Sequence, residues 1–261
     1  MSTTRLTLYR GWLDPGKYVW SPFVIKLEAR LRFAGISYKT EGGSPKSGPK
    51  GKIPYVELYK TEDPTASTSL GDSTLIIRHL VEQGILPDLN GRLVPSARAE
   101  DLAIRALMEE KLCFYHTRER WTENYHTMRD HILSSLPYPV RVVVGLLIYR
   151  NTIQTLHGQG SGRHSADEIR EFRHEIWTAI SDLLVASRSA KPRDPTQPFW
   201  ILGGEQPTEA DATVFAFVVS VLICTAGPES QGVVKEFPVL EDYAQKIHDR
   251  YFPDYVKWSD L

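Results

Sequence analysis

Three short segments near the start of the chain carry polar groups that could hold and activate a small anionic ligand. They are Trp20-Ser21-Pro22-Phe23, Gly51-Lys52-Ile53-Pro54 and Gly71-Asp72-Ser73. The first and third each precede an apolar periodic run, which is typical of a helix N-terminus. Such a terminus offers unpaired N–H groups and a positive dipole end, so both segments could bind an anion.

The hydroxyl of Ser21 could donate a hydrogen bond to a ligand thiolate without being the nucleophile itself. A free thiol has a pKa of about 8.5, and each unit of pKa depression favours the reactive thiolate by about 1.4 kcal/mol. The alternative is that Ser21 only caps the helix, which is the commoner role for an isolated Ser-Pro pair. Tyr9 and Tyr18 flank the same segment and are alternative hydroxyl donors, although tyrosines at strand ends more often pack.

The other two segments suit the two ends of a short peptide. We expect the Ile53–Pro54 bond to be cis, which would leave the Ile53 backbone free to pair with an extended ligand. Asp72 could bind an ammonium group, and the hydroxyl and N–H of Ser73 could bind a carboxylate. An ordinary trans proline and plain helix capping are the alternatives, and for either pair taken alone they are the more frequent.

The elements that must position these segments form an α/β unit. The hydrophobic periodicity and turn residues predict strands and helices in the order strand, helix, strand, strand, helix, at residues 6–12, 22–35, 36–40, 53–58 and 73–84. Residues 61–71 are expected to be a turn. A strand, a helix and a strand in succession favour parallel strands joined by a right-handed crossover.

The rest of the chain is predicted to be helical. Residues 87–95 hold two prolines and are expected to link a first domain, 1–86, to a second, 96–261. The second domain should open with a long helix at 96–121. Thr208 and Asp211 are spaced as a capping box for the nearly all-apolar stretch 212–226, which we expect to be a buried helix.

Composition and charge argue against several classes of function. The net charge of −1 provides no basic field for nucleic acid or anionic lipid. Cys113 and Cys224 lie far apart without a CxxC or Cys/His spacing, so we expect buried thiols and no metal. The apolar run 142–148 is too short to cross a membrane, and residues 1–11 show no signal-peptide pattern. We therefore expect a cytoplasmic protein without a membrane span.

The order and spacing of the three segments resemble the glutathione-binding set of the glutathione transferases. Trp20-Ser21-Pro22-Phe23-Val24 is similar to the plant tau class, where the serine of this segment is the catalytic hydroxyl. Nearly the whole chain is similar to the failed axon connections and metaxin-related branch, through the stretches SPFVIKLEARLRFAGI, PKGKIPYVEL, DSTLIIRHL and GQGSGRHS. Many members of that branch have a cysteine in the first-helix segment. Residues 21–24 hold none, which disfavours thiol transfer through a protein cysteine.

The resemblance implies the glutathione transferase fold, with a thioredoxin-like α/β N-terminal domain and an all-helical C-terminal domain. It also implies a role for each residue of the three segments. Ser21 would activate the glutathione thiol, Lys52 would meet the glycyl carboxylate, Ile53 before Pro54 would pair with the cysteinyl backbone, and Asp72 with Ser73 would hold the γ-glutamyl end. Asp72 stands where glutamate is usual.

The function implied is conjugation of glutathione, as co-substrate, to a small hydrophobic electrophile, as in detoxification. The electrophile would bind at the domain junction, where Tyr115 and Trp121 are candidate lining residues. A second hypothesis is a non-catalytic, metaxin-like binding or assembly protein. Neither hypothesis involves nucleic acid, and a homodimer is left open.

Overall fold

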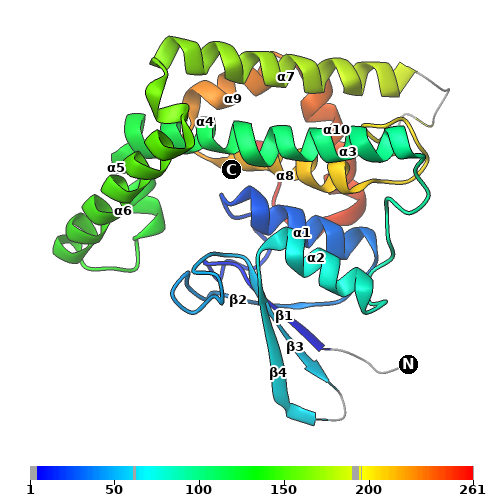
Figure 1. Ribbon diagram of the computed structural model, residues 1–261, viewed down its shortest axis with the longest axis horizontal. Helices are drawn as coiled ribbons and strands as arrows, with labels where there is room; N and C mark the ends of the chain where they lie inside the picture. Colours follow the sequence, from blue (N-terminus) through cyan, green and yellow to red (C-terminus); the bar gives the residue numbers. More distant parts are fainter. Residues whose placement is uncertain (1–4, 61–62, 190–193, 195, 261) are drawn as a thin grey trace.

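A computed structural model (Figure 1) describes residues 5–60, 63–189, 194 and 196–260. Its N-terminal part is a four-stranded sheet with two helices. In chain order the elements are β1 Arg5–Tyr9, α1 Pro22–Phe33, β2 Lys39–Glu41, β3 Tyr55–Lys60, β4 Asp63–Gly71 and α2 Ser73–Glu82. The spatial order of the strands is β2-β1-β3-β4. β1 and β2 are parallel, as predicted for the first crossover, and β3 is antiparallel to both β1 and β4.

The remainder of the described chain is helical, as expected. A continuous rod comes first, in which two π-helical segments alternate with α-helix, and shorter and longer helices follow it. The elements are α3 Pro95–Ala106, η1 Leu107–Leu112, α4 Cys113–Arg118, η2 Glu119–Glu123, α5 Tyr125–Ile132, α6 Tyr138–Gln159, η3 Ser161–Arg163, α7 Ala166–Ser189, α8 Glu209–Ile223, α9 Pro228–Lys235, α10 Pro238–Tyr251 and η4 Trp258–Asp260.

Two elements differ from the sequence-based expectation. Residues 63–71 form strand β4 instead of a turn, while residues 61 and 62 lie outside the described part. The segment contains few β-branched apolar residues because it is an edge strand. Its backbone pairs with β3, and Ser67, Thr68 and Ser69 are exposed. The second difference is the single long helix expected at 96–121, which is interrupted by π-helical segments at Leu107–Leu112 and Glu119–Glu123.

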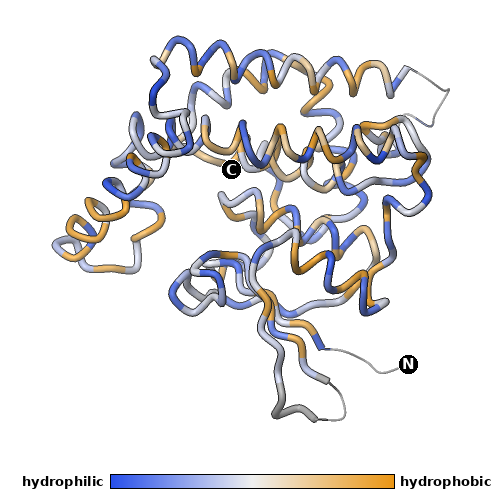
Figure 2. The backbone as a smooth tube through the Cα atoms, viewed as in Figure 1, coloured by the Kyte–Doolittle hydropathy of each residue, from blue (hydrophilic) through white to orange (hydrophobic). Residues whose placement is uncertain are grey.

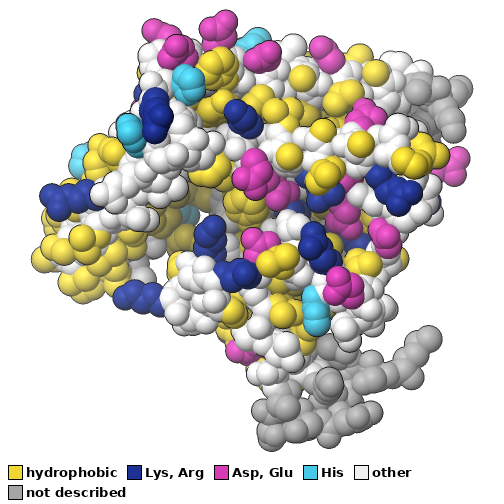
Figure 3. Space-filling model, in the orientation of Figure 1, with side chains coloured by type: hydrophobic (Ala, Val, Ile, Leu, Met, Phe, Trp, Pro, Cys, Tyr) yellow, Lys and Arg dark blue, Asp and Glu magenta, His cyan; other side chains and the backbone are white. Residues whose placement is uncertain are grey.

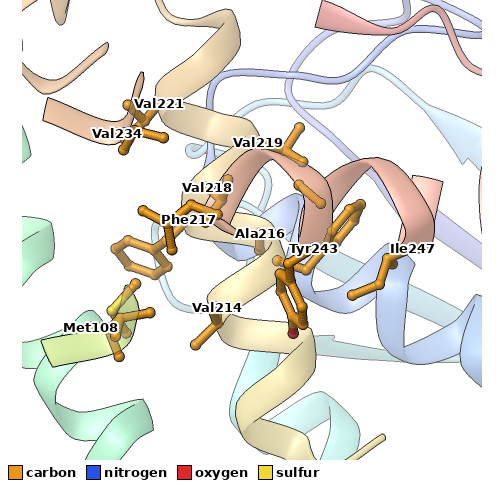
Figure 4. Packing of buried hydrophobic residues seen from close by; sticks show 14 of the residues in the cluster. Met108, Val214, Ala216, Phe217, Val218, Val219, Val221, Val234, Tyr243 and Ile247 are labelled. Carbon is orange, nitrogen blue, oxygen red and sulfur yellow. The ribbon is translucent and has the colours of Figure 1, made fainter. Parts of the chain in front are cut away.

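Helix α8 forms the centre of the helical domain (Figure 4), where its side chains contact α10, α9 and the rod. All its residues after Glu209 are buried. The capping box at its start is present as predicted, since the Thr208 N–H donates to Asp211 Oδ2 at 2.8 Å. α1 packs along α8 and so joins the two domains. No described helix is by itself long and apolar enough to cross a membrane; α8 and α9 reach that length only as a pair bent by 120°.

Candidate functional site

The strand register brings the second and third polar segments to the same edge of the sheet. Tyr9 of β1 pairs with Tyr55 of β3, and Tyr55 pairs with Gly71 of β4. Pro54 directly precedes this row and Asp72 directly follows it. β1 also ends here, before the chain continues to α1 (Figure 1). The sheet topology therefore brings the second and third segments together, and the first segment follows β1 after a loop.

Ser21 is the N-cap of α1, but its side chain does not cap the helix. Its backbone is extended, with φ −79° and ψ 115°, and Pro22 occupies the first helical turn. No capping hydrogen bond is made by the hydroxyl, and no other described residue bonds it. The side chain is only partly buried. A hydroxyl at a helix N-terminus thus remains free to donate to a ligand, and the plain capping alternative does not hold here.

A cavity of about 260 Å³ opens directly against Ser21. The N-terminal domain and the rod form most of its wall, and α5 and α8 complete it. The lining residues are Trp12, Trp20, Ser21, Pro22, Phe23, Ile53, Cys113, His116, Thr117, Arg120, Trp121, Met128, Ile132 and Phe217. Ser21 and Ile53, predicted from two separate segments, therefore face the same space. The wall is mainly aromatic and aliphatic, which suits a small apolar molecule.

Arg120 ties the segment before α1 to the helical domain. Its guanidinium donates to the carbonyl oxygen of Trp20 at 3.2 Å and to Ser220 Oγ at 3.1 Å. Ser220 Oγ donates in turn to the Trp20 carbonyl at 2.6 Å. Trp20 immediately precedes Ser21, so this buried network fixes the backbone next to Ser21.

The rod contributes two titratable groups to the wall, and burial keeps both uncharged. Burial lowers the pKa of the His116 imidazole well below its usual value, and the nearby positive charges of Arg120 and Arg173 lower it further. Burial raises the pKa of the Cys113 thiol to about 11, although Arg120 opposes this. A thiol with such a pKa is not a nucleophile near neutral pH, so Cys113 does not act as one here.

Asp72 and Ser73 form the start of α2. Asp72 Oδ1 accepts hydrogen bonds from the N–H groups of Thr74 at 3.0 Å and Leu75 at 3.1 Å. Asp72 has φ +78°, and among the described residues it is the one non-glycine residue with a positive φ. Such strain is uncommon and tends to occur at binding sites. Part of the Asp72 carboxylate is thus used for capping, as the plain alternative proposed, and the Ser73 side chain is buried.

Of the remaining predicted features, the structure shows the cis bond, whereas three of the predicted residues lie outside the cavity. The Ile53–Pro54 bond is cis, as predicted. Lys52 is exposed and outside the cavity lining. The Tyr9 hydroxyl donates to Glu57 at 2.7 Å, which raises the pKa of Tyr9 above its usual value. Tyr18 is buried with its hydroxyl 2.8 Å from His248 Nδ1. The structure brings neither tyrosine to the cavity, so the alternative hydroxyls are not supported by position.

Of the two residues predicted to line the electrophile pocket, one lies in the cavity and the other does not. Trp121 lines the cavity, but Tyr115 faces the helical core and stacks on Phe172 with ring centroids 6.1 Å apart. Sequence reasoning missed Trp12, Met128, Ile132 and Phe217. It also missed four residues of the rod, which are Cys113, His116, Thr117 and Arg120. They recur at i, i+3, i+4 and i+7, the spacing of one helix face. That stripe could have been found in the sequence, whereas Tyr115 falls between its members.

Comparisons with known proteins agree with this architecture. Residues 22–128 match the family described as glutathione S-transferase N-terminal domain. The chain is 25% identical over 257 residues to Failed axon connections of Drosophila melanogaster, covering 92% of this chain and 56% of that protein. The chain thus spans little more than half the length of that relative. It is 28% identical over 239 residues to isoprene-epoxide–glutathione S-transferase of Rhodococcus sp., covering 88% of this chain and 92% of that enzyme.

A solved structure shows the same fold. It is a glutathione S-transferase of Methylobacterium radiotolerans in complex with glutathione sulfonate, with a TM-score of 0.55 and 15% identity. The match covers 97% of this chain and 96% of that chain. The mixed sheet followed by a helical domain is therefore the glutathione transferase fold, as the sequence resemblance implied. Within the described residues, no three His, Cys, Asp or Glu side chains are grouped as ligands of a metal would be.

Proposed function

Because the chain belongs to the glutathione S-transferase superfamily, we propose that it binds glutathione and transfers it to a small hydrophobic electrophile. The observation that carries the proposal is the Ser21 hydroxyl, which bonds to no other described residue and opens onto an apolar cavity. In a protein that only used this segment to start a helix, the hydroxyl would be expected to cap α1.

The proposed chemistry is nucleophilic attack by the glutathione sulfur. The thiol proton leaves to solvent, and Ser21 donates a hydrogen bond to the remaining thiolate at the positive end of α1. The thiolate then forms a bond to an electrophilic carbon held against Trp20, Phe217 and their neighbours. At the same time a leaving group departs or a strained ring opens. The protein contributes mainly positioning and electrostatic stabilisation.

The remaining segments would hold the ends of glutathione. Ser73 and Asp72, at the N-terminus of α2, suit the γ-glutamyl carboxylate and ammonium groups. The exposed Lys52 suits the glycyl carboxylate. Asp72 Oδ1 already accepts two backbone N–H groups, so the ammonium contact would have to use the other oxygen.

The decisive test is a Ser21→Ala variant, with exposed Ser37→Ala as the matched control. Loss of one hydrogen bond to a charged sulfur should lower kcat/KM for a generic chloronitrobenzene electrophile about tenfold to a hundredfold. It should also raise the pKa of the bound glutathione thiol, measured by thiolate absorbance. Ser37→Ala should change neither. Unaltered conjugation and thiol pKa in Ser21→Ala would reject the role of this hydroxyl.

The second hypothesis is a non-catalytic binding or assembly protein, suggested by the match to Failed axon connections. A measurement of glutathione binding distinguishes the transferase hypothesis from the assembly hypothesis. A ligand that binds only the folded state stabilises it by about 2.7 kcal/mol at a hundredfold excess over its Kd. A melting temperature unchanged by millimolar glutathione would favour the assembly hypothesis, and a clear rise would favour the enzyme.

A further inference from the structure

Helices α5 and α6 form a hairpin at one end of the helical domain. Figure 1 shows it at the left of the molecule, with the loop between the helices at its far end. The end of α5 next to this loop contacts the N-terminal domain, where His131 stacks on Trp20 with ring centroids 3.5 Å apart. We call the half of α6 that follows the loop its outer half.

That outer half carries an exposed apolar surface, visible as orange tube in Figure 2 and as gathered yellow side chains in Figure 3. Six of the twelve large apolar side chains that are exposed among the described residues belong to α6. We call five of these the α6 tip patch: Tyr138, Val140, Val143, Leu146 and Leu147. Val143 is 59% exposed and Leu147 60% exposed. Clustered exposure of this kind marks an interaction surface.

Tyr138 lies beside α5, with its ring centroid 5.7 Å from the Arg129 guanidinium carbon, but Val143 and Leu147 are not on the face of α6 that packs on α5. Gly145 is buried there, since a Cβ at this position would lie 2.7 Å from Arg129 Cγ and from the Tyr125 hydroxyl. Val143 and Leu147 point away from that contact, four residues apart on the outer face. Beyond Tyr149 the same outer face becomes polar, at Arg150, Gln154 and His157. The apolar surface is therefore concentrated in the outer half of α6, next to the loop between the helices.

The net charge of the hairpin favours contact between the α6 tip patch and an anionic surface. Residues 124–160 contain Arg129, Arg141 and Arg150 but only one carboxylate, Asp130, which gives the hairpin a net charge of +2 in a chain of net charge −1. Asp130 is already paired with Arg129 at 2.8 Å and with Arg141 at 3.6 Å. Contact with a second copy would bring two such positively charged surfaces together, which is unfavourable, whereas an anionic surface complements them.

We propose that the α6 tip patch docks on a phospholipid bilayer that contains anionic lipids, independently of the proposed transferase activity. The apolar half of α6, from Tyr138 to Tyr149, is about 18 Å long. This is too short for the hydrocarbon core of about 30 Å, so the helix lies in the interface instead of crossing it. Tyr138 and Tyr149 at its two ends, and Arg150 next to Tyr149, suit the headgroup level. Local charge thus overrides the expectation from net charge that anionic lipid is not bound.

The experiment is flotation of the full chain with vesicles of phosphatidylcholine, with and without phosphatidylserine. The double variant Val143→Asp/Leu147→Asp removes the apolar contact. The matched control is Leu102→Asp, at a residue that is 58% exposed on α3. The wild type and the control should float with the phosphatidylserine vesicles, and the double variant should lose at least about tenfold in partition constant. Melting curves establish that all three proteins are folded.

Two outcomes would overturn the proposal. One is that the wild type does not float with either kind of vesicle. The other is that light scattering shows a concentration-dependent dimer that the double variant, but not Leu102→Asp, dissociates; the patch would then bind a second copy. Stronger flotation at low salt than at high salt would support an electrostatic contribution to vesicle binding, because salt screens surface potentials.

Discussion

Two helices of this protein have similar apolar sequences and opposite surroundings. Residues 212–223 of α8 read ATVFAFVVSVLI, and residues 140–149 of α6 read VRVVVGLLIY. α8 is enclosed by α1, α3, α9 and α10 and is buried along its length. α6 is covered mainly by α5 and the end of the rod and leaves its outer face open. Apolar composition predicts a helix that needs a partner, but only tertiary structure shows whether the partner is present.

Polar anchors account for part of the difference. The Asp211 carboxylate on α8 accepts from the Ile201 N–H at 2.8 Å and from the Tyr243 hydroxyl at 2.9 Å, in addition to its capping bonds with Thr208. At the other end, Ser220 joins α8 to the backbone before Ser21. α6 begins after Pro137 without a side-chain cap. α8 is therefore fixed at both ends and reaches the candidate site, whereas α6 is not held in this way.

The largest expected contrast is in stability. Phe215→Ala on α8 should lower the free energy of unfolding by about 3–5 kcal/mol, because the side chain is fully buried and leaves a cavity. Leu147→Ala on the open face of α6 should change it by about 0.5 kcal/mol or less. Urea denaturation monitored by circular dichroism measures both. Equal losses in the two variants would show that the α6 face is covered in solution.

The next effect concerns pH. Burial raises the pKa of Asp211 from its ordinary 3.8 to about 6. The folded state then binds more protons than the unfolded state between these values, so stability should be greatest below pH ~4 and should fall by about 3 kcal/mol as pH rises through about 6. The α6 hairpin offers no buried carboxylate with such a shift among its described residues. In Asp211→Asn this slope should disappear, and the control Asp242→Asn should retain it.

The segments of the candidate site could be predicted from the sequence better than its walls. Ser21, Ile53 and Asp72 were found because helix starts and a strand start have local signals that persist in the fold. Strand β4 was missed, since an edge strand is held by backbone pairing with β3 and needs few apolar side chains.

The wall formed by the rod could be predicted only in part. Trp121 was expected there, but Tyr115 was chosen in place of His116, its neighbour in the chain. One residue turns a helix by 100°, so this choice required the orientation of the rod against α1 and α8. The orientation depends on contacts such as Arg120 with Ser220, between residues 100 apart in the sequence. Local patterns do not contain that information.

A smaller effect tests whether α8 positions the site. Ser220→Ala removes the hydroxyl that donates to the Trp20 carbonyl, so the segment carrying Ser21 should become less well fixed. We expect kcat for conjugation to fall about tenfold, with little change in the KM for glutathione, because Ser220 does not line the cavity. Ser220→Thr, which keeps the hydroxyl, should restore much of the rate. A loss confined to thermal stability would assign Ser220 a structural role alone.

The smallest expected effect concerns the one closely packed point of α6. A Cβ at Gly145 would lie 2.7 Å from both Arg129 Cγ and the Tyr125 hydroxyl, so Gly145→Ala forces α5 and α6 apart. Overpacking costs about 1–3 kcal/mol, and the better helix propensity of alanine returns up to about 1 kcal/mol. The net loss of about 1 kcal/mol should stay local, because α6 is not part of the α8 core. Hydrogen exchange should therefore quicken in α5 and α6 and remain unchanged in α8; faster exchange in both would show that the hairpin and the core unfold as one cooperative unit.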